Sequence, residues 1–161
     1  MKRLAGAIGA LVLMGFAAAG PAYADPTSMQ DRVDAVIATY PGGTQTDWNE
    51  VSWDGGDAIL TLAPEGVDGP AARAAVGSCA NGTYCVYSAA NLGGSKLTFT
   101  SCTAHGVSAL GGPVRSVANG RSSGNVVGLN GVLLVVVATP SSYVNTTATV
   151  TFPMRTRFES S

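Results

Sequence analysis

The order of apolar and polar residues changes along the chain, and the first clear pattern is helical. Apolar residues recur at spacings of three and four positions, which places them on one face of a helix. These residues are Met29, Val33, Val36, Ile37 and Tyr40. Thr27 or Ser28 can serve as the N-cap, and Pro41-Gly42-Gly43 ends the pattern. The spacing predicts a short amphipathic helix.

Two short segments after this helix predict a β-hairpin. They are residues 50–53 and 58–62, and the turn sequence Asp54-Gly55-Gly56-Asp57 connects them. The spacing of the two aspartates does not fit an EF-hand calcium loop. Aspartate at a glycine-rich turn usually serves backbone hydrogen bonding, so we interpret both as turn residues. Trp48 and Trp53 lie in or beside this hairpin, where we expect them to pack.

The rest of the chain has short runs rich in Val and Thr, with turn formers roughly every eight to twelve residues. The last of these runs cover residues 126–127, 132–138 and 147–152. Asn130-Gly131 and Pro140-Ser141-Ser142 separate them. Such punctuation is typical of an all-β sandwich or barrel. The predicted fold is therefore mainly β, preceded by a small α+β module made of the helix and the hairpin.

The N-terminus has the features of a secretory signal peptide. Lys2 and Arg3 precede an apolar stretch over residues 4–19, and Ala22-Tyr23-Ala24 supplies small residues for a cleavage site. The apolar stretch is shorter than the ~20 residues of a membrane-spanning helix. We expect residues 1–24 to be removed, and the mature protein to be secreted to the extracellular space without a membrane association.

Charge divides the mature chain into two parts of opposite sign. Residues 25–68 carry nine carboxylates and one base, Arg32, for a formal charge of −8. Residues 69–161 carry six bases and one carboxylate, Glu159, for a formal charge of +5. Opposite net charges attract in water of moderate ionic strength, so we expect the two parts to dock. The alternative is a leader that moves independently of the rest of the chain, because the linker contains Gly and Pro.

These observations predict the organisation of the chain. An acidic helix and hairpin leader covers residues 25–64, a linker covers residues 65–72, and a β domain covers residues 73–161. We expect the apolar face of the helix to contact the Val-rich strands after Gly131 when the two parts dock.

The residue types needed for catalysis are scarce in the basic part. His105 is the sole histidine of the chain, and a Ser-His-Asp relay would have to take its acid from the acidic part. A glycosidase needs two facing carboxylates and a zinc hydrolase needs several ligand residues, and the basic part supplies neither set. We therefore predict no enzymatic activity, no metal and no cofactor. The absence of a basic tract argues against a nucleic-acid partner.

A family resemblance begins at Cys79. The segment Cys79-Ala80-Asn81-Gly82-Thr83-Tyr84-Cys85-Val86-Tyr87, followed by Asn91-Leu92-Gly93-Gly94, resembles the first half of a βγ-crystallin Greek key. The family signature of two aromatics and a glycine falls on Tyr87, Leu92 and Gly94, with Leu92 in place of the second aromatic. The resemblance implies that Tyr87 packs over the hairpin and that Gly94 takes a backbone angle that side chains disfavour. It also implies that the Ser116 hydroxyl ties back to the hairpin.

Within this superfamily, residues 79–125 look most like peptidase inhibitor family 36, the streptomycete metalloproteinase inhibitor type. The Cys-x5-Cys pair and the run Arg115-Ser116-Val117-Ala118-Asn119-Gly120 support this resemblance. The acidic helix and hairpin resemble the leader of secreted actinobacterial relatives. The resemblance implies an extracellular peptidase as partner and a disulfide between Cys79 and Cys85.

The third cysteine leaves alternatives for the disulfide. With Cys79 paired to Cys85, the thiol of Cys102 is free or forms an intermolecular bond. The competing pair is Cys79 with Cys102, because an antiparallel hairpin that turns near Leu92 brings these two strand ends together.

The chain also departs from the family and the superfamily. The resemblance implies that the founding inhibitor acts through a second loop closed by a disulfide. Residues 126–161 contain no cysteine, so the reactive loop of the founding inhibitor cannot be assigned to residues of this chain. Calcium-binding members of the superfamily use paired Asn or Asp residues and hydroxyls. Gly111-Gly112-Pro113-Val114-Arg115-Ser116 keeps only the last of these, so we expect no calcium site.

The resemblance implies a secreted, non-catalytic peptidase inhibitor. The alternatives are an extracellular binding or structural module without inhibitory activity, and a small secreted antimicrobial toxin.

Overall fold

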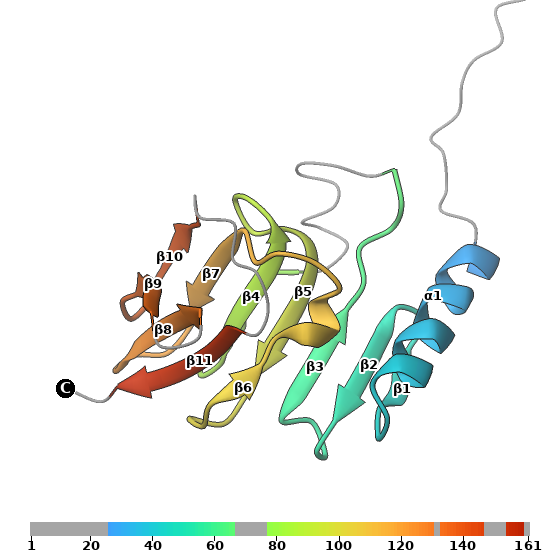
Figure 1. Cartoon of the computed structure of the whole chain (residues 1–161), viewed down its shortest axis with the longest axis horizontal. Helices are drawn as coiled ribbons and strands as arrows, with labels where there is room; N and C mark the ends of the chain where they lie inside the picture. Colours follow the sequence, from blue (N-terminus) through green and yellow to red (C-terminus); the bar gives the residue numbers. More distant parts are fainter. Residues whose placement is uncertain (1–25, 67–76, 131–132, 147–153, 160–161) are drawn as a thin grey trace, which may run out of the picture.

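The computed structural model describes residues 26–66, 77–130, 133–146 and 154–159, which form antiparallel β-strands and one α-helix (Figure 1). The predicted mainly β class is confirmed. The predicted signal peptide, most of the predicted linker and the predicted strand over residues 147–152 lie outside the described residues.

The larger sheet has seven strands in the order β1-β2-β3-β5-β4-β7-β10, and all neighbouring pairs are antiparallel. In chain order the strands are β1 Thr44–Asp47, β2 Glu50–Trp53, β3 Ala58–Thr61, β4 Tyr84–Ala89, β5 Gly93–Phe99, β7 Ser116–Asn119 and β10 Ser142–Asn145.

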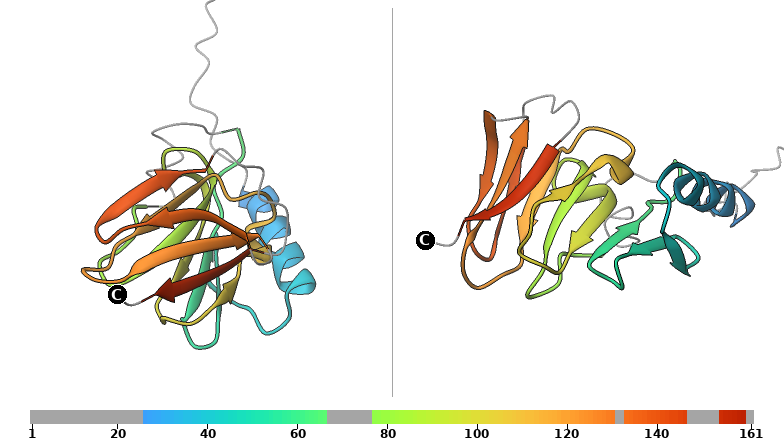
Figure 2. Two further views of the ribbon diagram at one scale, coloured as in Figure 1. Left: turned by 60° about the vertical axis from the view of Figure 1, so that its left-hand side comes forward. Right: turned by 60° about the horizontal axis from the view of Figure 1, so that its bottom comes forward.

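The smaller sheet has four strands in the order β6-β11-β8-β9. These strands are β6 His105–Gly106, β8 Asn125–Asn130, β9 Leu133–Ala138 and β11 Met154–Glu159. The predicted strands near residues 126–127 and 132–138 correspond to β8 and β9. Two further views show the smaller sheet packed against the larger one (Figure 2). The chain therefore passes from β5 into the smaller sheet and returns at β7 to the side of β4.

The predicted helix is confirmed as α1, Pro26–Thr39. Its buried face packs on β1 and β2, with Met29 and Val33 fully buried and Val36 and Ile37 partly buried. The helix begins at Pro26, so the prediction of Thr27 or Ser28 as N-cap is wrong. Proline suits the first turn of a helix because an amide hydrogen there has no partner in the helix.

The segment after α1 lies close against the hairpin. The indole nitrogen of Trp53 donates to the Tyr40 carbonyl at 3.1 Å, and the Tyr40 hydroxyl donates to the Ser108 carbonyl at 2.8 Å. A Cβ atom at Gly43 would lie only 2.8 Å from side-chain atoms of both Trp53 and Val51. Glycine at position 43 therefore allows the chain after α1 to approach β2.

The predicted hairpin is confirmed as β2 and β3, with Val51 opposite Leu60. The structure adds β1, which pairs with β2 and was not predicted. The residues of β1 are Thr44, Gln45, Thr46 and Asp47, which are polar and mostly exposed. A strand of this composition has no alternation of apolar and polar residues, and that alternation is the signal by which sequence reveals a strand.

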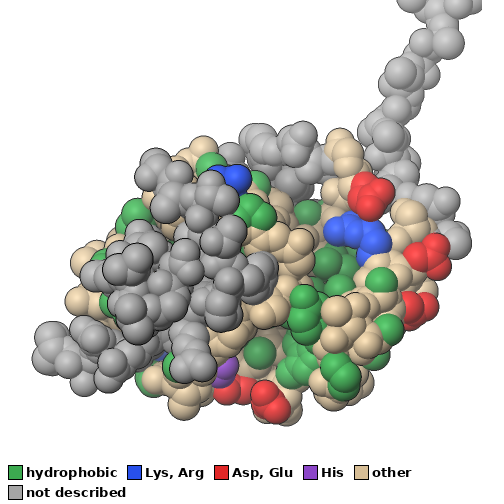
Figure 3. Space-filling model, viewed as in Figure 1, with side chains coloured by type: hydrophobic (Ala, Val, Ile, Leu, Met, Phe, Trp, Pro, Cys, Tyr) green, Lys and Arg blue, Asp and Glu red, His purple; other side chains and the backbone are tan. Residues whose placement is uncertain are grey.

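The acidic and basic parts are in contact, but at a place that the sequence did not indicate. Strand β3 pairs with β5, so that Leu60 lies opposite Leu97 and Thr61 lies opposite Lys96. The predicted contact was instead the helix face against the strands after Gly131. Acidic side chains on the face shown in Figure 3 gather over α1 and the hairpin. The hairpin thus continues the sheet of the basic part through backbone hydrogen bonds.

One hydrophobic core crosses this boundary. It contains Met29 and Val33 of α1, Val51 and Leu60 of the hairpin, and residues of both sheets beyond it. The buried residues contributed by strands β4, β5, β7, β8 and β9 are Tyr84, Val86, Leu97, Phe99, Val117, Val126 and Ala138. The described residues before and after the linker therefore share one core.

We predict that Leu60→Ala destabilises the whole described fold. Leu60 is fully buried, and its truncation is expected to cost about 2–5 kcal/mol in the free energy of unfolding. Ile59→Ala is the matched control, because Ile59 is the adjacent, only partly buried residue of the same strand. Urea unfolding followed by near-UV circular dichroism measures both variants. Two separate transitions, with only one shifted by Leu60→Ala, would contradict a shared core.

Candidate functional site

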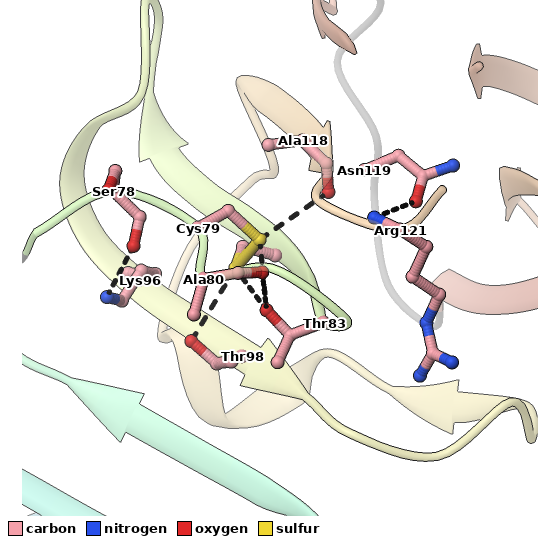
Figure 4. The surroundings of a disulfide bond; sticks show 10 residues. Ser78, Cys79, Ala80, Thr83, Lys96, Thr98, Ala118, Asn119 and Arg121 are labelled. Atoms are coloured by element: carbon pink, nitrogen blue, oxygen red, sulfur yellow. Dashed lines mark hydrogen bonds between the residues drawn. A yellow bond between two sulfur atoms is a disulfide. The ribbon is translucent and has the colours of Figure 1, made fainter. Parts of the chain in front are cut away.

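The disulfide joins Cys79 to Cys85, the pair implied by the family resemblance (Figure 4). Cys85 is buried on β4, and Cys79 is partly buried on the segment before it. The competing pair of Cys79 with Cys102 is not formed, and Cys102 carries an exposed free thiol. The bond therefore closes a local loop at the start of the basic part.

This local loop is also attached to its neighbours by hydrogen bonds. The Gly82 amide donates to the Gly120 carbonyl, and the Gly120 amide donates to the Thr83 carbonyl, both at 2.9 Å. A Cβ atom at Gly120 would lie 2.3 Å from the Ala80 carbonyl oxygen. Only glycine at position 120 permits this approach, so the disulfide loop is held against the chain that follows β7.

The β4–β5 turn brings the predicted motif residues together. The Ser116 hydroxyl donates to the Ala89 carbonyl at 2.8 Å and accepts the Leu92 amide at 3.1 Å. Leu92 and Gly94 both have positive φ angles, 61° and 71°. A Cβ atom at Gly94 would lie 2.2 Å from the Ser88 hydroxyl oxygen. The hydroxyl of β7 thus bridges the two sides of the turn.

Tyr87 lies under this turn on the face of β4 that carries Cys85. It is fully buried in a small cluster with Cys85 and Ala118, against which Cys79 and Leu92 pack. Burial raises the pKa of Tyr87 to about 12. A tyrosine in this setting acts as a packing residue, because its ionised form is strongly disfavoured.

Arg121 binds the loop between β5 and β6, which covers residues 100–104. Its guanidinium donates to the carbonyls of Thr100 and Ser101, the second at 3.0 Å, and to the Cys102 sulfur at 3.0 Å. The same group lies 5.9 Å from the centre of the Tyr84 ring. One cation therefore fixes three consecutive residues of the β5–β6 loop.

Asp57 of the hairpin binds the same loop from the other side. Its Oδ1 atom accepts the Thr100 hydroxyl at 2.8 Å and the Ser101 amide at 2.7 Å. The His105 Nε2 atom lies 3.7 Å from Asp57 Oδ2, 2.8 Å from the Ser101 hydroxyl and 2.9 Å from the Thr103 hydroxyl. A turn aspartate of the acidic part thus joins a serine and a histidine of the basic part.

The pKa of Asp57 reflects this environment. Burial alone raises it, but the hydrogen bonds from Thr100 and Ser101 and the proximity of His105 together hold the pKa of Asp57 below its usual value. The carboxylate form is therefore favoured in the folded protein.

The central part of the chain is similar to a known protein family. Residues 72–128 match peptidase inhibitor family I36. This family I36 segment contains the disulfide, the β4–β5 turn, the β5–β6 loop and Arg121, and it excludes α1 and the hairpin. No curated protein matches the chain, and no solved structure matches it.

The sequence predicts Asp57 as a turn residue and does not predict that it meets Ser101 and His105. The three residues do not have the geometry of a catalytic relay. In a Ser-His-Asp relay, the acid binds Nδ1 and the serine binds Nε2, so that a proton passes across the ring. Here the nearest approaches of Asp57, Ser101 and Thr103 are all to Nε2. The match of residues 72–128 to a peptidase inhibitor family favours a non-catalytic role for that segment.

The described residues contain neither a cluster of metal-ligand residues nor a helix that could span a membrane. Within residues 26–66, 77–130, 133–146 and 154–159, His, Cys, Asp and Glu form no group of three or more that could hold a metal ion. The helix in this part of the chain is too short to be a membrane-span candidate.

We predict that Asp57→Asn flattens the dependence of stability on acid. Because the folded-state pKa of Asp57 is lowered from 3.8, its stabilisation is present above that value and is lost as the pH falls through the folded-state pKa. Thermal unfolding between about pH 2 and pH 6 should show a smaller loss for Asp57→Asn than for the natural sequence. Asp54→Asn in the same turn is the control, because Asp54 is exposed and asparagine tolerates its φ of 51°. Parallel acid profiles for the natural protein and Asp57→Asn would contradict the role of Asp57.

We predict that non-reducing tryptic mapping finds the disulfide within one peptide. Cleavage after Arg73 and Lys96 leaves Cys79 and Cys85 together, and cleavage after Arg115 leaves Cys102 on the following peptide. Iodoacetamide should label Cys102 without prior reduction, because its thiol is exposed. A covalent link between the two peptides would show the competing pairing instead.

Proposed function

We propose that the protein is a secreted, non-catalytic inhibitor of an extracellular peptidase. The match of residues 72–128 to peptidase inhibitor family I36 carries this proposal. The target class proposed is a metalloendopeptidase, in keeping with the resemblance of residues 79–125 to the streptomycete metalloproteinase inhibitor type.

Secretion is part of the proposal. Residues 1–24 have the charged, apolar and small-residue regions of a signal peptide. A disulfide between Cys79 and Cys85 suits an oxidising compartment outside the cytoplasm. Both features support a function in the extracellular space.

A βγ-crystallin-like Greek key is the proposed framework of the inhibitor. In a Greek key, the fourth strand returns to lie beside the first. The position of β7 next to β4, reached after β6 has paired in the smaller sheet, supports this arrangement. The bond from Ser116 to the β4–β5 turn supports it further.

We predict that the mature protein, residues 25–161, inhibits a metalloendopeptidase of the thermolysin type. The measurement is residual activity of a panel of metallo-, serine and cysteine endopeptidases against a short fluorogenic peptide, with increasing amounts of the protein. Saturable inhibition of one enzyme at a stoichiometry near one to one is the expected result. Gel analysis of the same mixtures is the control, because a protein that merely competes as a substrate is consumed during the assay.

A loss of peptidase activity that does not saturate with added protein would contradict inhibition. So would full activity of every peptidase in the panel at micromolar concentrations of the protein. The second outcome would favour an extracellular binding or structural module.

A further inference from the structure

The β5–β6 loop combines exposure with a fixed backbone. Thr100, Cys102, Thr103 and Ala104 are exposed, whereas Phe99, directly before the loop, is only 1% exposed. The ring of His105, directly after the loop, stacks on the Phe99 ring at a centroid distance of 4.5 Å. The two residues that flank the exposed loop, Phe99 and His105, are therefore held at the core.

The backbone of the loop is held by groups from two separate elements. Arg121 binds the carbonyls of Thr100 and Ser101. The backbone carbonyl of Asp57 accepts the Thr100 amide at 3.0 Å, and its carboxylate accepts the Ser101 amide at 2.7 Å. Hydrogen bonds to charged groups are the stronger class, so these contacts restrict the loop more than neutral ones would.

The tip of the loop is fixed as well. The Thr103 carbonyl accepts the Tyr84 hydroxyl at 3.3 Å, and the Thr103 side chain binds His105. The exposed side chains at the tip are those of Cys102, Thr103 and Ala104, which are small and uncharged. Such side chains add little bulk to the loop, which suits entry into a narrow cleft.

We propose that residues 100–104 form the surface that enters the active-site cleft of the inhibited peptidase. This inference rests on the proposed function and names the contact loop that the sequence could not supply. A segment that is already ordered before binding loses little conformational entropy on association, which favours tight binding. The partner that fits is an endopeptidase whose cleft accepts small, uncharged side chains.

The hydrogen bonds made by Arg121 and Asp57 give the loop a second property. A peptide bond is cleaved only when the segment around it can follow the reacting groups into the transition-state geometry. Arg121 and Asp57 restrict that movement at Thr100 and Ser101, so we expect the bound peptidase to cleave the loop slowly.

Ala104→Arg tests the contact directly, because Ala104 is exposed and its methyl group holds no part of the loop. Ala90→Arg is the matched control, since Ala90 is an exposed alanine in the turn at the opposite end of β5. With the peptidase found in the panel, Ala104→Arg should raise the inhibition constant roughly tenfold or more, and Ala90→Arg should leave it unchanged. Thermal unfolding of both variants should match the natural protein.

Hydrogen exchange of the complex gives a second measurement that needs no variant. Amides within residues 100–104 should exchange more slowly when the peptidase is bound. Arg121→Gln should increase the rate at which the same peptidase cuts within this loop, because the carbonyls of Thr100 and Ser101 lose the guanidinium that donates to them.

The outcomes separate this inference from the function on which it rests. If the natural protein inhibits, but Ala104→Arg inhibits equally well and residues 100–104 gain no protection, the loop assignment is wrong and the function stands. If the natural protein inhibits no member of the panel, the proposed function itself is wrong.

Discussion

The pairing of β3 with β5 is the interaction on which the described fold depends. It extends the sheet of the family I36 segment by the three strands of the acidic part. It also brings the β2–β3 turn to the end of β5, where Asp57 meets Thr100 and Ser101. Without this ladder, α1 would cover only a separate three-stranded sheet of β1, β2 and β3, and the β5–β6 loop would be held on one side only. Net charge attracts the two parts, but the backbone register determines which residues meet.

The sequence was informative where a local pattern fixes a local structure. Spacings of three and four predicted α1, and the Asp-Gly-Gly-Asp turn predicted the β2–β3 hairpin. The disulfide followed from the family resemblance, since three cysteines alone allowed another pairing. In each of these cases the residues that carry the signal lie within a few positions of one another.

The sequence was less informative where contacts join distant residues. Asp57 was interpreted as a turn residue, and its bonds to a loop more than forty residues away depend on a strand pairing that no periodicity encodes. Arg121 carried no motif, although it binds three consecutive loop residues. Strand β1 escaped prediction because its exposed, polar residues contribute little to a core. The candidate contact loop is thus held by residues that only the folded chain brings together.

The hairpin also determines which strand lies at one edge of the larger sheet. Strand β5 has seven residues, including the apolar Leu97 and Phe99, and a long unpaired edge is a template for aggregation. The outermost strand is instead β1, which has four residues, ends in Asp47 and shifts its register within the pairing with β2. Short, charged and irregular edges are the means by which natural proteins avoid edge-to-edge association. Strand β1, which contributes no residue to the core, therefore forms an edge of the sheet with which another chain pairs poorly. This edge disfavours association between copies of the protein at high concentration.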